Sequence, residues 1–460
     1  MVNIFLSAVS GTILSAAFAP LSLWWVAPIA VALHMYCVNR FPRPFLSSLV
    51  FALTFNALVL HWTSIYVGAT PWLILTFGQA LLSLPLGLAK KYGIALYPFM
   101  FIVLEELRNR FPFQGFGWLR IAYSQADAPY RRIAAFGGAT GLSAMTLALA
   151  LTIFMLSKAR INLVPLLPLA LLLIPLPIHV IGVTKALMVQ GDVPQLGLDF
   201  NSRATQVFYN HIEESKKALV VNQDVDFILW PENSVDVDPF TYPGIGKALD
   251  ALAKPLIIGA VIREKGSLEN TSILWTKDSK NVYVKAHLTP FGEYIPLRAL
   301  ARKISPLVDS VEDFTSGRST KVFTVRNAKI APIICFELID DSLVQKALRQ
   351  ANLIVVQTNN ATFGKSSESA QQLAISRIRA IEYGRNILSV STTGISATIN
   401  YHGDIGVKTP IHTPAYIFST PELIDTQTPR AIAGDWAGVV ALMWLLLIGA
   451  LPGRMGKYRR

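Results

Sequence analysis

Charged residues and cysteines are scarce in this sequence. Only 15% of its 460 residues are Asp, Glu, Lys or Arg, compared with about 25% in an ordinary soluble domain. The two cysteines, Cys37 and Cys335, lie far apart in the chain, which argues against a disulfide framework. Hydrophobic residues make up 52% of the chain and the mean hydropathy is +0.44. This composition excludes an ordinary soluble protein and predicts a chain that lies largely in a membrane.

Apolar residues gather in eight runs, each approaching the roughly 20 residues that a helix needs to cross a bilayer. The expected membrane helices cover residues 4–19, 24–38, 45–67, 72–89, 93–104, 133–156, 163–183 and 437–451. The first run could be mistaken for a secretory signal, since Ala17-Phe18-Ala19 resembles a cleavage site. No basic residue precedes it and Pro20 would follow the cut, so we interpret it as a retained helix.

Basic residues follow the second, fourth, sixth and last runs, and Lys and Arg in short loops stay on the cytoplasmic side. These residues are Arg40, Arg43, Lys90, Lys91, Lys158, Arg160, Arg454, Lys457, Arg459 and Arg460. We therefore predict a polytopic helical membrane bundle in residues 1–183. An extracytoplasmic domain follows in residues 184–432, and residues 433–460 supply a final helix with a basic cytoplasmic tail.

The connection between the fifth and sixth runs departs from this charge rule. It carries Arg108, Arg110, Arg120, Arg131 and Arg132 on the outer side, beside Glu105 and Glu106. One interpretation is contact with anionic lipid phosphate, with Trp118 and Arg120 as candidate substrate contacts. The other is neutralisation by the acidic pair, with long side chains reaching out of the bilayer. The net charge of +12 needs no nucleic-acid partner, because much of it flanks the membrane runs.

From residue 185 onward, short β-type runs alternate with amphipathic helical patterns. The predicted strands cover residues 185–193, 227–230, 255–263, 272–275, 282–286, 329–335, 353–357 and 387–391. Helical patterns cover residues 205–220, 342–351 and 368–383. This alternation predicts one α/β domain with a buried sheet core.

Three motifs in this domain could carry chemistry. Glu232 directly follows a hydrophobic strand, where partial burial would favour a general base. Lys285 ends another strand, with Glu293 in the Gly- and Pro-containing turn that follows. The lysine could stabilise an oxyanion and the glutamate could hold it in place. Taken singly, the first motif is better interpreted as a solvated residue at the end of a strand, and the second as an ordinary surface ion pair.

Cys335 stands where a strand meets the helical segment that starts near residue 341. We expect the positive end of that helix to lower the pKa of the thiol and make it a nucleophile. The alternative is a small buried apolar residue at the end of a strand.

Glu, Lys and Cys in this order, each at the end of a strand, resemble the nitrilase (carbon–nitrogen hydrolase) superfamily. Within it the chain resembles the apolipoprotein N-acyltransferase family over nearly its whole length. Further similar segments are Phe18-Ala19-Pro20, residues 115–119, residues 123–125, residues 290–293 and residues 379–385. The resemblance implies an N-terminal membrane bundle, an extracytoplasmic nitrilase-like α-β-β-α sandwich and a last membrane helix.

Carried over, the resemblance makes Glu232 the general base, Lys285 the cationic stabiliser and Cys335 the acyl-accepting nucleophile. Glu293, Phe336 and Glu337 would support this triad, and the candidate substrate contacts in this domain are Asn233, Thr362 and Phe363. Phe336 and Thr362 depart from a common family pattern of Tyr and Trp, so lipid or acceptor preference could differ.

The implied activity moves a fatty acyl chain from a membrane phospholipid, through a Cys335 thioester, to the amino terminus of a diacylated bacterial apolipoprotein. It needs no metal or organic cofactor, and it implies a multi-pass protein of the bacterial cytoplasmic membrane. One rival is a membrane-anchored nitrilase or amidase that acts on a small amide or nitrile. The other is a transporter, but the apolar runs hold almost no ionisable residue near mid-membrane.

Overall fold

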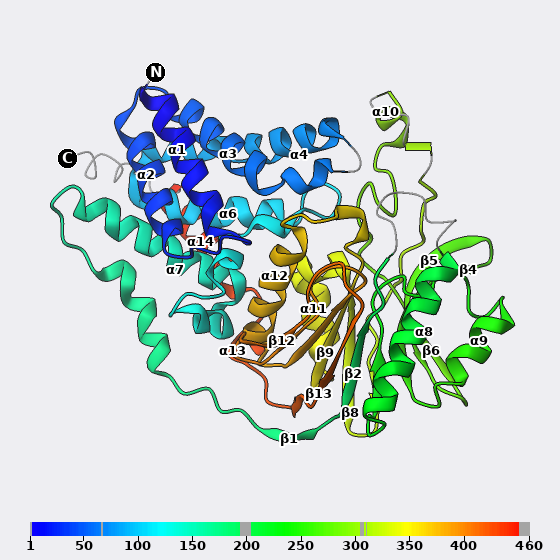
Figure 1. The fold of residues 1–460 in the computed structure, drawn as a ribbon. Helices are drawn as coiled ribbons and strands as arrows, with labels where there is room; N and C mark the ends of the chain where they lie inside the picture. The colour runs from blue at the N-terminus through cyan, green and yellow to red at the C-terminus, as the bar shows by residue number, and fades with distance from the viewer. Residues whose placement is uncertain (1, 66–67, 194–203, 304–307, 310, 450–460) are drawn as a thin grey trace. The chain divides into compact units, whose positions relative to one another are not determined.

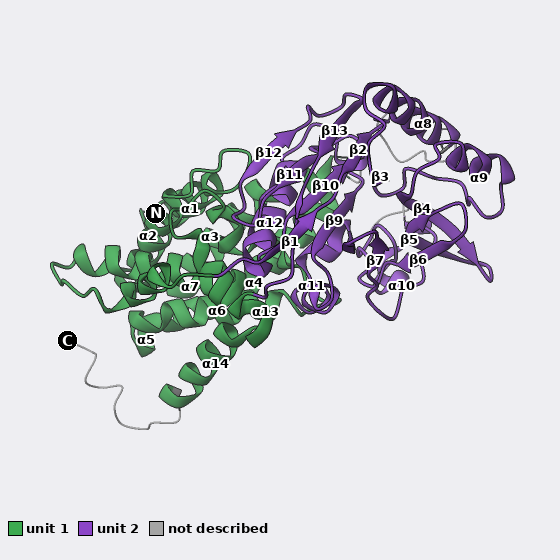
Figure 2. Cartoon of the chain, turned by 90° about the horizontal axis from the view of Figure 1, so that it is seen from below, with its two compact units in different colours: residues 1–176, 428–460 green, residues 177–427 purple. Residues whose placement is uncertain are grey.

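The computed structural model describes residues 2–65, 68–193, 204–303, 308–309 and 311–449, and Figure 1 traces their order along the chain. The chain divides into two compact units, coloured separately in Figure 2. Unit 1 joins Met1–Leu176 to Thr428–Arg460, and unit 2 comprises Pro177–Gln427. These divisions fall several residues before the predicted boundaries at 183/184 and 432/433. The predicted basic tail, residues 454–460, lies outside the described residues.

Unit 1 is helical. Helix α1 packs against α2 and α3, α2 packs against α7, and α14 packs against α6 and α7. Short 3₁₀ helices connect several of these elements, η4 (Gly117–Leu119) and η5 (Ile121–Gln125) among them. The α-helices are α1 (Val2–Ala17), α2 (Val26–Arg40), α3 (Pro44–Val59), α4 (Ala69–Leu81), α5 (Ala89–Tyr92), α6 (Tyr97–Arg108), α7 (Ala134–Leu156), α13 (Pro429–Ala433) and α14 (Trp436–Gly449).

Two helical stretches among the described residues are long and apolar enough to cross a membrane, Ala69–Tyr92 and Arg131–Leu156. The first joins α4 to α5 through a 3₁₀ segment, and the second contains α7. Shorter apolar helices cover Val2–Ala17, Pro44–Val59, Val164–Leu173 and Trp436–Ile448, and helices α2 and α6 overlap the predicted runs 24–38 and 93–104.

The predicted helix over residues 163–183 is wrong. A 3₁₀ helix, η7, covers only Val164–Leu173, and the chain then becomes extended and enters strand β1 (Val180–Val183). Prolines at positions 165, 168, 175 and 177 explain the difference, because each removes a backbone donor and clashes with the preceding helical turn. High apolarity alone therefore does not make this run an α-helix.

Unit 2 contains two six-stranded sheets. Their strand orders are β13-β2-β3-β4-β5-β6 and β12-β11-β10-β9-β8-β7, and β1 pairs separately with β14. Strands β2, β3 and β4 run parallel, as do β8, β9 and β10. The strands are β2 (Ala186–Gln190), β3 (Phe227–Leu229), β4 (Leu256–Glu264), β5 (Ser267–Trp275), β6 (Lys280–Val284), β7 (Phe323–Val325), β8 (Ala328–Ile334), β9 (Leu353–Thr358), β10 (Ile387–Ser391), β11 (Ala397–Ile399), β12 (Ile405–Lys408), β13 (Ala415–Ser419) and β14 (Glu422–Ile424).

Alternating side chains divide unit 2 into four layers. Phe227 and Leu229 of β3 enter one buried cluster with side chains of both sheets, including Ile330 and Val355. Ile228, between them, belongs to a second cluster with side chains of the flanking helices. One sheet thus packs against the other on its inner face and against helices on its outer face, as the two-residue period of a strand requires. The helices of this unit are α8 (Ala204–Val221), α9 (Pro243–Asp250), α10 (Arg298–Ala301), α11 (Asp341–Leu348) and α12 (Glu368–Tyr383).

Each of the eight predicted strands of this unit corresponds to a strand of the structure, and the three predicted helices correspond to α8, α11 and α12. The sequence patterns missed β1, β7 and β11 to β14, which have three to five residues each. Such short segments hold too few alternations to reveal a period of two.

Candidate active site

The loop after β3 places Glu232 at the carboxyl edge of its sheet. The side chain is 4% exposed. Gly259 of the neighbouring strand β4 lets this loop approach, because a Cβ there would lie 2.4 Å from the carbonyl oxygen of Pro231 and 2.5 Å from Cα of Glu232. The loop and β4 are further joined by a hydrogen bond from the Val235 amide to the Gly259 carbonyl. The absence of a side chain at Gly259 therefore allows the Glu232 loop to pack this closely against the sheet.

Glu232 meets Lys285 and Glu293 in a buried cluster. Nζ of Lys285 lies 3.2 Å from Oε1 of Glu232 and 2.9 Å from Oε2 of Glu293. Asn270 of β5 donates from Nδ2 to both carboxylates, at 2.8 Å to Glu232 and 2.6 Å to Glu293. The amide of Thr289 adds a hydrogen bond of 2.7 Å to Glu293. The structure thus brings together the predicted base, the predicted cation and one predicted supporting carboxylate.

Electrostatics keep Lys285 and Glu293 of this cluster charged. Burial alone would lower the pKa of Lys285, but Glu232 and Glu293 outweigh it and the pKa is raised. Burial alone would raise the pKa of Glu293, but Lys285 and the hydrogen bonds from Asn270 and Thr289 outweigh it and the pKa is lowered. Lys285 is therefore a fixed cation in a protein interior, held by carboxylate neighbours on two sides.

Cys335 follows β8 and opens the five-residue 3₁₀ helix η9 (Cys335–Ile339). Its φ of 50° is in the left-handed region, which a residue other than glycine occupies at a cost of about 1–3 kcal/mol. The residue is half-buried. This sharp turn at Cys335 ends strand β8. Backbone conformations of this kind are found at functional sites.

The prediction that a helix dipole lowers the pKa of Cys335 is wrong. Burial, followed by the negative charge of Glu232, raises the pKa of the thiol well above its ordinary value, although Lys285 acts in the opposite direction. Helix α11 begins only at Asp341, and its N-cap is Asp340, which accepts from the amides of Ser342 and Leu343. The helix terminus is thus already occupied, and the resting sulfur is a neutral thiol that needs a base.

Glu337 joins the loops that carry the cysteine and the lysine. Its carboxylate accepts from the amides of Ile334 at 2.8 Å and Ala286 at 2.6 Å, and from the hydroxyl of Tyr283 at 2.7 Å. Ile334 ends β8 of one sheet, whereas Tyr283 and Ala286 lie in and after β6 of the other. Glu337 is fully buried and links the two sheets beside the candidate nucleophile.

The remaining predicted residues of this unit lie in several settings. Phe336 is buried, with its ring edge-on to His287 at 5.3 Å between ring centres. Asn233 has a φ of 53°, and its Oδ1 is buried without a hydrogen-bond partner among the described residues. Thr362 and Phe363 are half-buried in the short 3₁₀ helix Ala361–Phe363. Substrate contact by Asn233, Thr362 and Phe363 remains a prediction.

Trp118 and Arg120 belong to unit 1, where both are buried. Arg120 is 2% exposed, and its guanidinium pairs with Glu106 at 2.6 Å. Glu106 also pairs with Arg110 and accepts from Thr140. This arrangement favours neutralisation by the acidic pair over lipid-phosphate contact for Arg120, and a substrate role for Trp118 and Arg120 remains a prediction.

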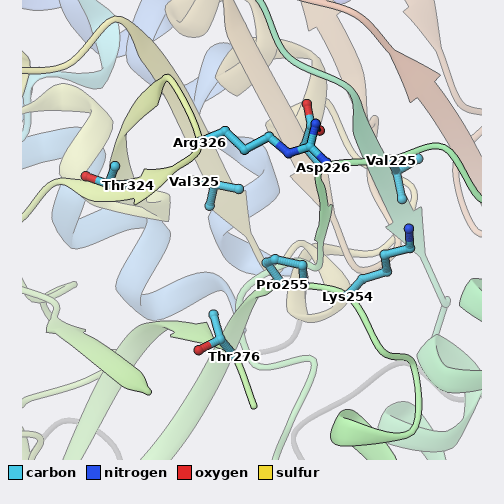
Figure 3. A pocket seen from close by; sticks show the side chains of 8 residues that line it. All are labelled: Val225, Asp226, Lys254, Pro255, Thr276, Thr324, Val325 and Arg326. Carbon is cyan, nitrogen blue, oxygen red and sulfur yellow. The ribbon is translucent and has the colours of Figure 1, made fainter. Parts of the chain in front are cut away.

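A cavity of about 310 Å³ lies away from this cluster (Figure 3). It is lined by residues that precede β3 and β4, follow β5 or end β7, and so occupies the edge of the sheet opposite Glu232. Arg326 reaches Asp226 at 2.9 Å, and Lys254 donates to the carbonyl of Gln223. Its charged groups are thus held by protein partners, and its lining includes no cysteine or glutamate.

Two neutral side chains at the site were missed in the sequence. Asn270 bridges the two carboxylates from the middle of β5, and Gln372 of α12 donates to Sγ of Cys335 at 3.6 Å. Neither side chain titrates, so acid–base reasoning does not single them out. Asn270 also lies in a polar segment before the predicted strand over residues 272–275, so the local sequence does not mark it.

Unit 2 contains a carbon–nitrogen hydrolase domain. Residues 201–413 match the Carbon-nitrogen hydrolase family, and residues 10–152 match the Apolipoprotein N-acyltransferase N-terminal domain. The chain is 31% identical to the apolipoprotein N-acyltransferase of Mycolicibacterium smegmatis, covering 94% of this chain and 81% of that protein. It is 25% identical to the apolipoprotein N-acyltransferase of Haemophilus influenzae, covering 96% and 93% of the two chains.

The chain therefore belongs to the apolipoprotein N-acyltransferase family. Among solved structures, it is similar to a carbon–nitrogen hydrolase superfamily protein from Xanthomonas campestris at 15% identity. That match covers 57% of this chain and 97% of the other with a TM-score of 0.40, which is too low to add to the family assignment.

Proposed function

We propose that this enzyme moves a fatty acyl chain from a membrane phospholipid to the N-terminal amine of S-diacylglyceryl-cysteine in bacterial apolipoproteins. The observation that carries the proposal is the buried Glu232–Lys285–Glu293 cluster, whose charges act on the Cys335 thiol, in a chain that matches apolipoprotein N-acyltransferases over nearly its full length. Acyl transfer through a thiol needs a base, a nucleophile and a fixed positive charge. Glu232, Cys335 and Lys285 supply these three groups.

In the first half-reaction, Glu232 takes the proton of the Cys335 thiol and the sulfur attacks the ester carbonyl of the phospholipid. Lys285 stabilises the oxyanion of the tetrahedral intermediate, and its carboxylate neighbours keep it protonated. The C–O bond breaks, Glu232 returns the proton to the departing alkoxide, and a lysophospholipid leaves. The acyl chain remains on sulfur as a thioester.

In the second half-reaction, the lipoprotein amine attacks the thioester carbonyl. Glu232 accepts a proton from the nitrogen as the C–N bond forms, and the C–S bond then breaks. The departing thiolate of Cys335 recovers that proton. The products are an amide on the lipoprotein and the free thiol of the enzyme, so the reaction is ping-pong and consumes no cofactor.

A membrane location fits both substrates, because each carries long acyl chains that cost about 0.8 kcal/mol per CH₂ to remove from an apolar phase. Among the described residues of unit 1, two helical stretches are long and apolar enough to cross a bilayer. Helix α14 also presents large apolar side chains at its surface, among them Val439, Met443 and Leu446. We propose a multi-pass arrangement in the bacterial cytoplasmic membrane, with unit 2 on the extracytoplasmic face.

The test is incubation of the purified full-length protein with radiolabelled phospholipid, with and without a diacylated lipopeptide. Wild type should form an acyl adduct on Cys335, visible by mass spectrometry, and should pass the label to the lipopeptide. Cys335→Ala should do neither while still entering the membrane. Absence of the adduct in wild type would exclude the covalent mechanism, and hydrolysis of a small amide without lipid transfer would favour an amidase.

A further inference from the structure

One hydrogen bond to the candidate nucleophile comes from outside the Glu–Lys–Cys group. Nε2 of Gln372 lies 3.6 Å from Sγ of Cys335, and Gln372 is 3% exposed. Its helix, α12, contacts the 3₁₀ helix that begins with the cysteine. A buried N–H aimed at sulfur stabilises a thiolate more than a thiol, because hydrogen bonds to charged groups are the stronger ones.

The amide of Gln372 is held in this orientation by Asn360. Oε1 of Gln372 accepts from Nδ2 of Asn360 at 3.1 Å, so the NH₂ end of Gln372 must face Cys335. Asn360 is itself fixed, because its Oδ1 accepts from the hydroxyls of Thr358, at 3.0 Å, and Ser391. In this orientation the amide oxygen of each residue accepts from a donor, and Nδ2 of Asn360 donates to Glu368 as well as to Gln372.

We propose that Gln372 is a further catalytic residue, which stabilises Sγ of Cys335 whenever the sulfur carries negative charge, and that Asn360 is the positioning residue that aims it. The inference rests on the proposed function only in assuming that Cys335 is the nucleophile. The sulfur is negative twice in the reaction, once when it attacks the ester and once when it leaves the thioester. The Gln372 donor acts at both points.

This donor matters because most other groups near the sulfur oppose its ionisation. Glu232 follows β3, Glu293 lies in the turn beyond β6, and Glu368 starts α12; all three raise the pKa of Cys335, and Lys285 acts in the opposite direction. Glu368 also accepts a hydrogen bond from Nδ2 of Asn360, and burial raises its own pKa to about 8.

The test measures alkylation of Cys335 by iodoacetamide against pH, in full-length protein, from the mass of the peptide that contains Cys335. Gln372→Met removes the donor and keeps the length of the side chain. The alkylation midpoint should rise by about one pH unit, as expected for loss of one hydrogen bond to an anion. Gln371→Met is the matched control, since Gln371 is also buried on α12 but donates to Ser367; its midpoint should remain that of wild type.

Asn360→Leu should raise the midpoint as well, because the Gln372 amide is then free to rotate. The double variant Asn360→Leu/Gln372→Met should rise no further than Gln372→Met alone, as expected when one residue acts through the other. Additive effects would overturn the positioning role of Asn360. Gln372→Leu provides the same measurement if the Met variant fails to fold, as judged by thermal unfolding.

A wild-type midpoint in a folded Gln372 variant would overturn the inference and leave the proposed function intact. Alkylation needs neither phospholipid nor lipopeptide, so failure of the proposed function can be distinguished from failure of this inference. If wild type forms no acyl adduct but the midpoint still shifts in Gln372→Met, the proposed function fails and the hydrogen bond to sulfur stands.

Discussion

Lys285 is a cation that acts on the Cys335 sulfur, and two of the nearby carboxylates hold it in place. Its side chain is 1% exposed, so water screens its charge only weakly. It lowers the pKa of the thiol, whereas burial and the nearby carboxylates raise it. Removal of Lys285 would therefore raise the pKa of the thiol.

Lys285→Met should move the midpoint of Cys335 alkylation to higher pH, since burial and the nearby carboxylates then raise the pKa of the thiol without an opposing positive charge. Below its pKa the sulfur is a neutral thiol, so the variant should be alkylated more slowly than wild type at each pH below that midpoint. Acyl transfer should fall by about 10²–10³, typical for the loss of one oxyanion-stabilising group. Exposed Lys277 offers the control Lys277→Met. An unchanged midpoint together with normal acyl transfer would remove Lys285 from the site.

At this scale the sequence revealed the ionisable groups and missed the neutral ones. Glu232, Lys285 and Cys335 are recognisable because each follows a strand and has a known acid–base or nucleophilic role. Asn270 and Gln372 act through hydrogen bonds whose geometry exists only after folding. The pKa of Cys335 was predicted in the wrong direction because local position suggested a helix dipole, whereas burial and Glu232 dominate.

At the scale of elements, the close contact between β4 and the Glu232 loop depends on one glycine. Besides the short Cβ contacts that any side chain at Gly259 would make, its amide donates to the Pro231 carbonyl and its carbonyl accepts from Ser234. The strand and the loop therefore cannot separate without losing hydrogen bonds. The position of the Glu232 carboxylate is set by this packing as much as by its own contacts.

Gly259→Ala should slow acyl transfer by up to about 10²-fold, because the loop must shift and catalysis is sensitive to displacements near 1 Å. The rate at which wild type and variant form the Cys335 adduct measures the effect. Gly244→Ala is a matched control on α9, where an added Cβ meets nothing within 4 Å, and it should be silent. Equal adduct rates for Gly259→Ala and wild type would show that the loop tolerates the shift.

Element prediction succeeded where one physical signal dominated. The long apolar strands β4 and β8 and the amphipathic helices α8 and α12 were recognisable from their periods. The run at residues 163–183 misled because hydropathy ignores proline, which appears four times within it. Short strands such as β13 depend on a distant partner, β2, and a local pattern cannot reveal that pairing.

For the whole molecule, unit 2 is an insertion within unit 1, since the chain leaves unit 1 at residue 176 and returns at residue 428. Near these crossings β1 and β14 pair as antiparallel strands, with Val180 opposite Ile424. The β1–β14 pair thus holds the first and last segments of unit 2 side by side.

Reporter fusions test the proposed arrangement in the membrane. A reporter after Arg160 should report a cytoplasmic location, because basic residues flank that point. One inserted at Lys265, in the exposed turn between β4 and β5, should report an extracytoplasmic location. The reverse pair of signals would overturn the orientation inferred from the basic loops.

The pairing of β13 with β2 also dictates an order of events during synthesis. Ala415 pairs with Gln190 and Ser419 with Ala186, so more than 200 residues must be made before β2 obtains its second neighbour. Until then β2 is an open edge that can pair with another chain. A ribosome stalled just before residue 415 would hold a nascent chain with Cys335 already made and an incomplete sheet, and the open edge of β2 would be exposed to aggregation at that stage.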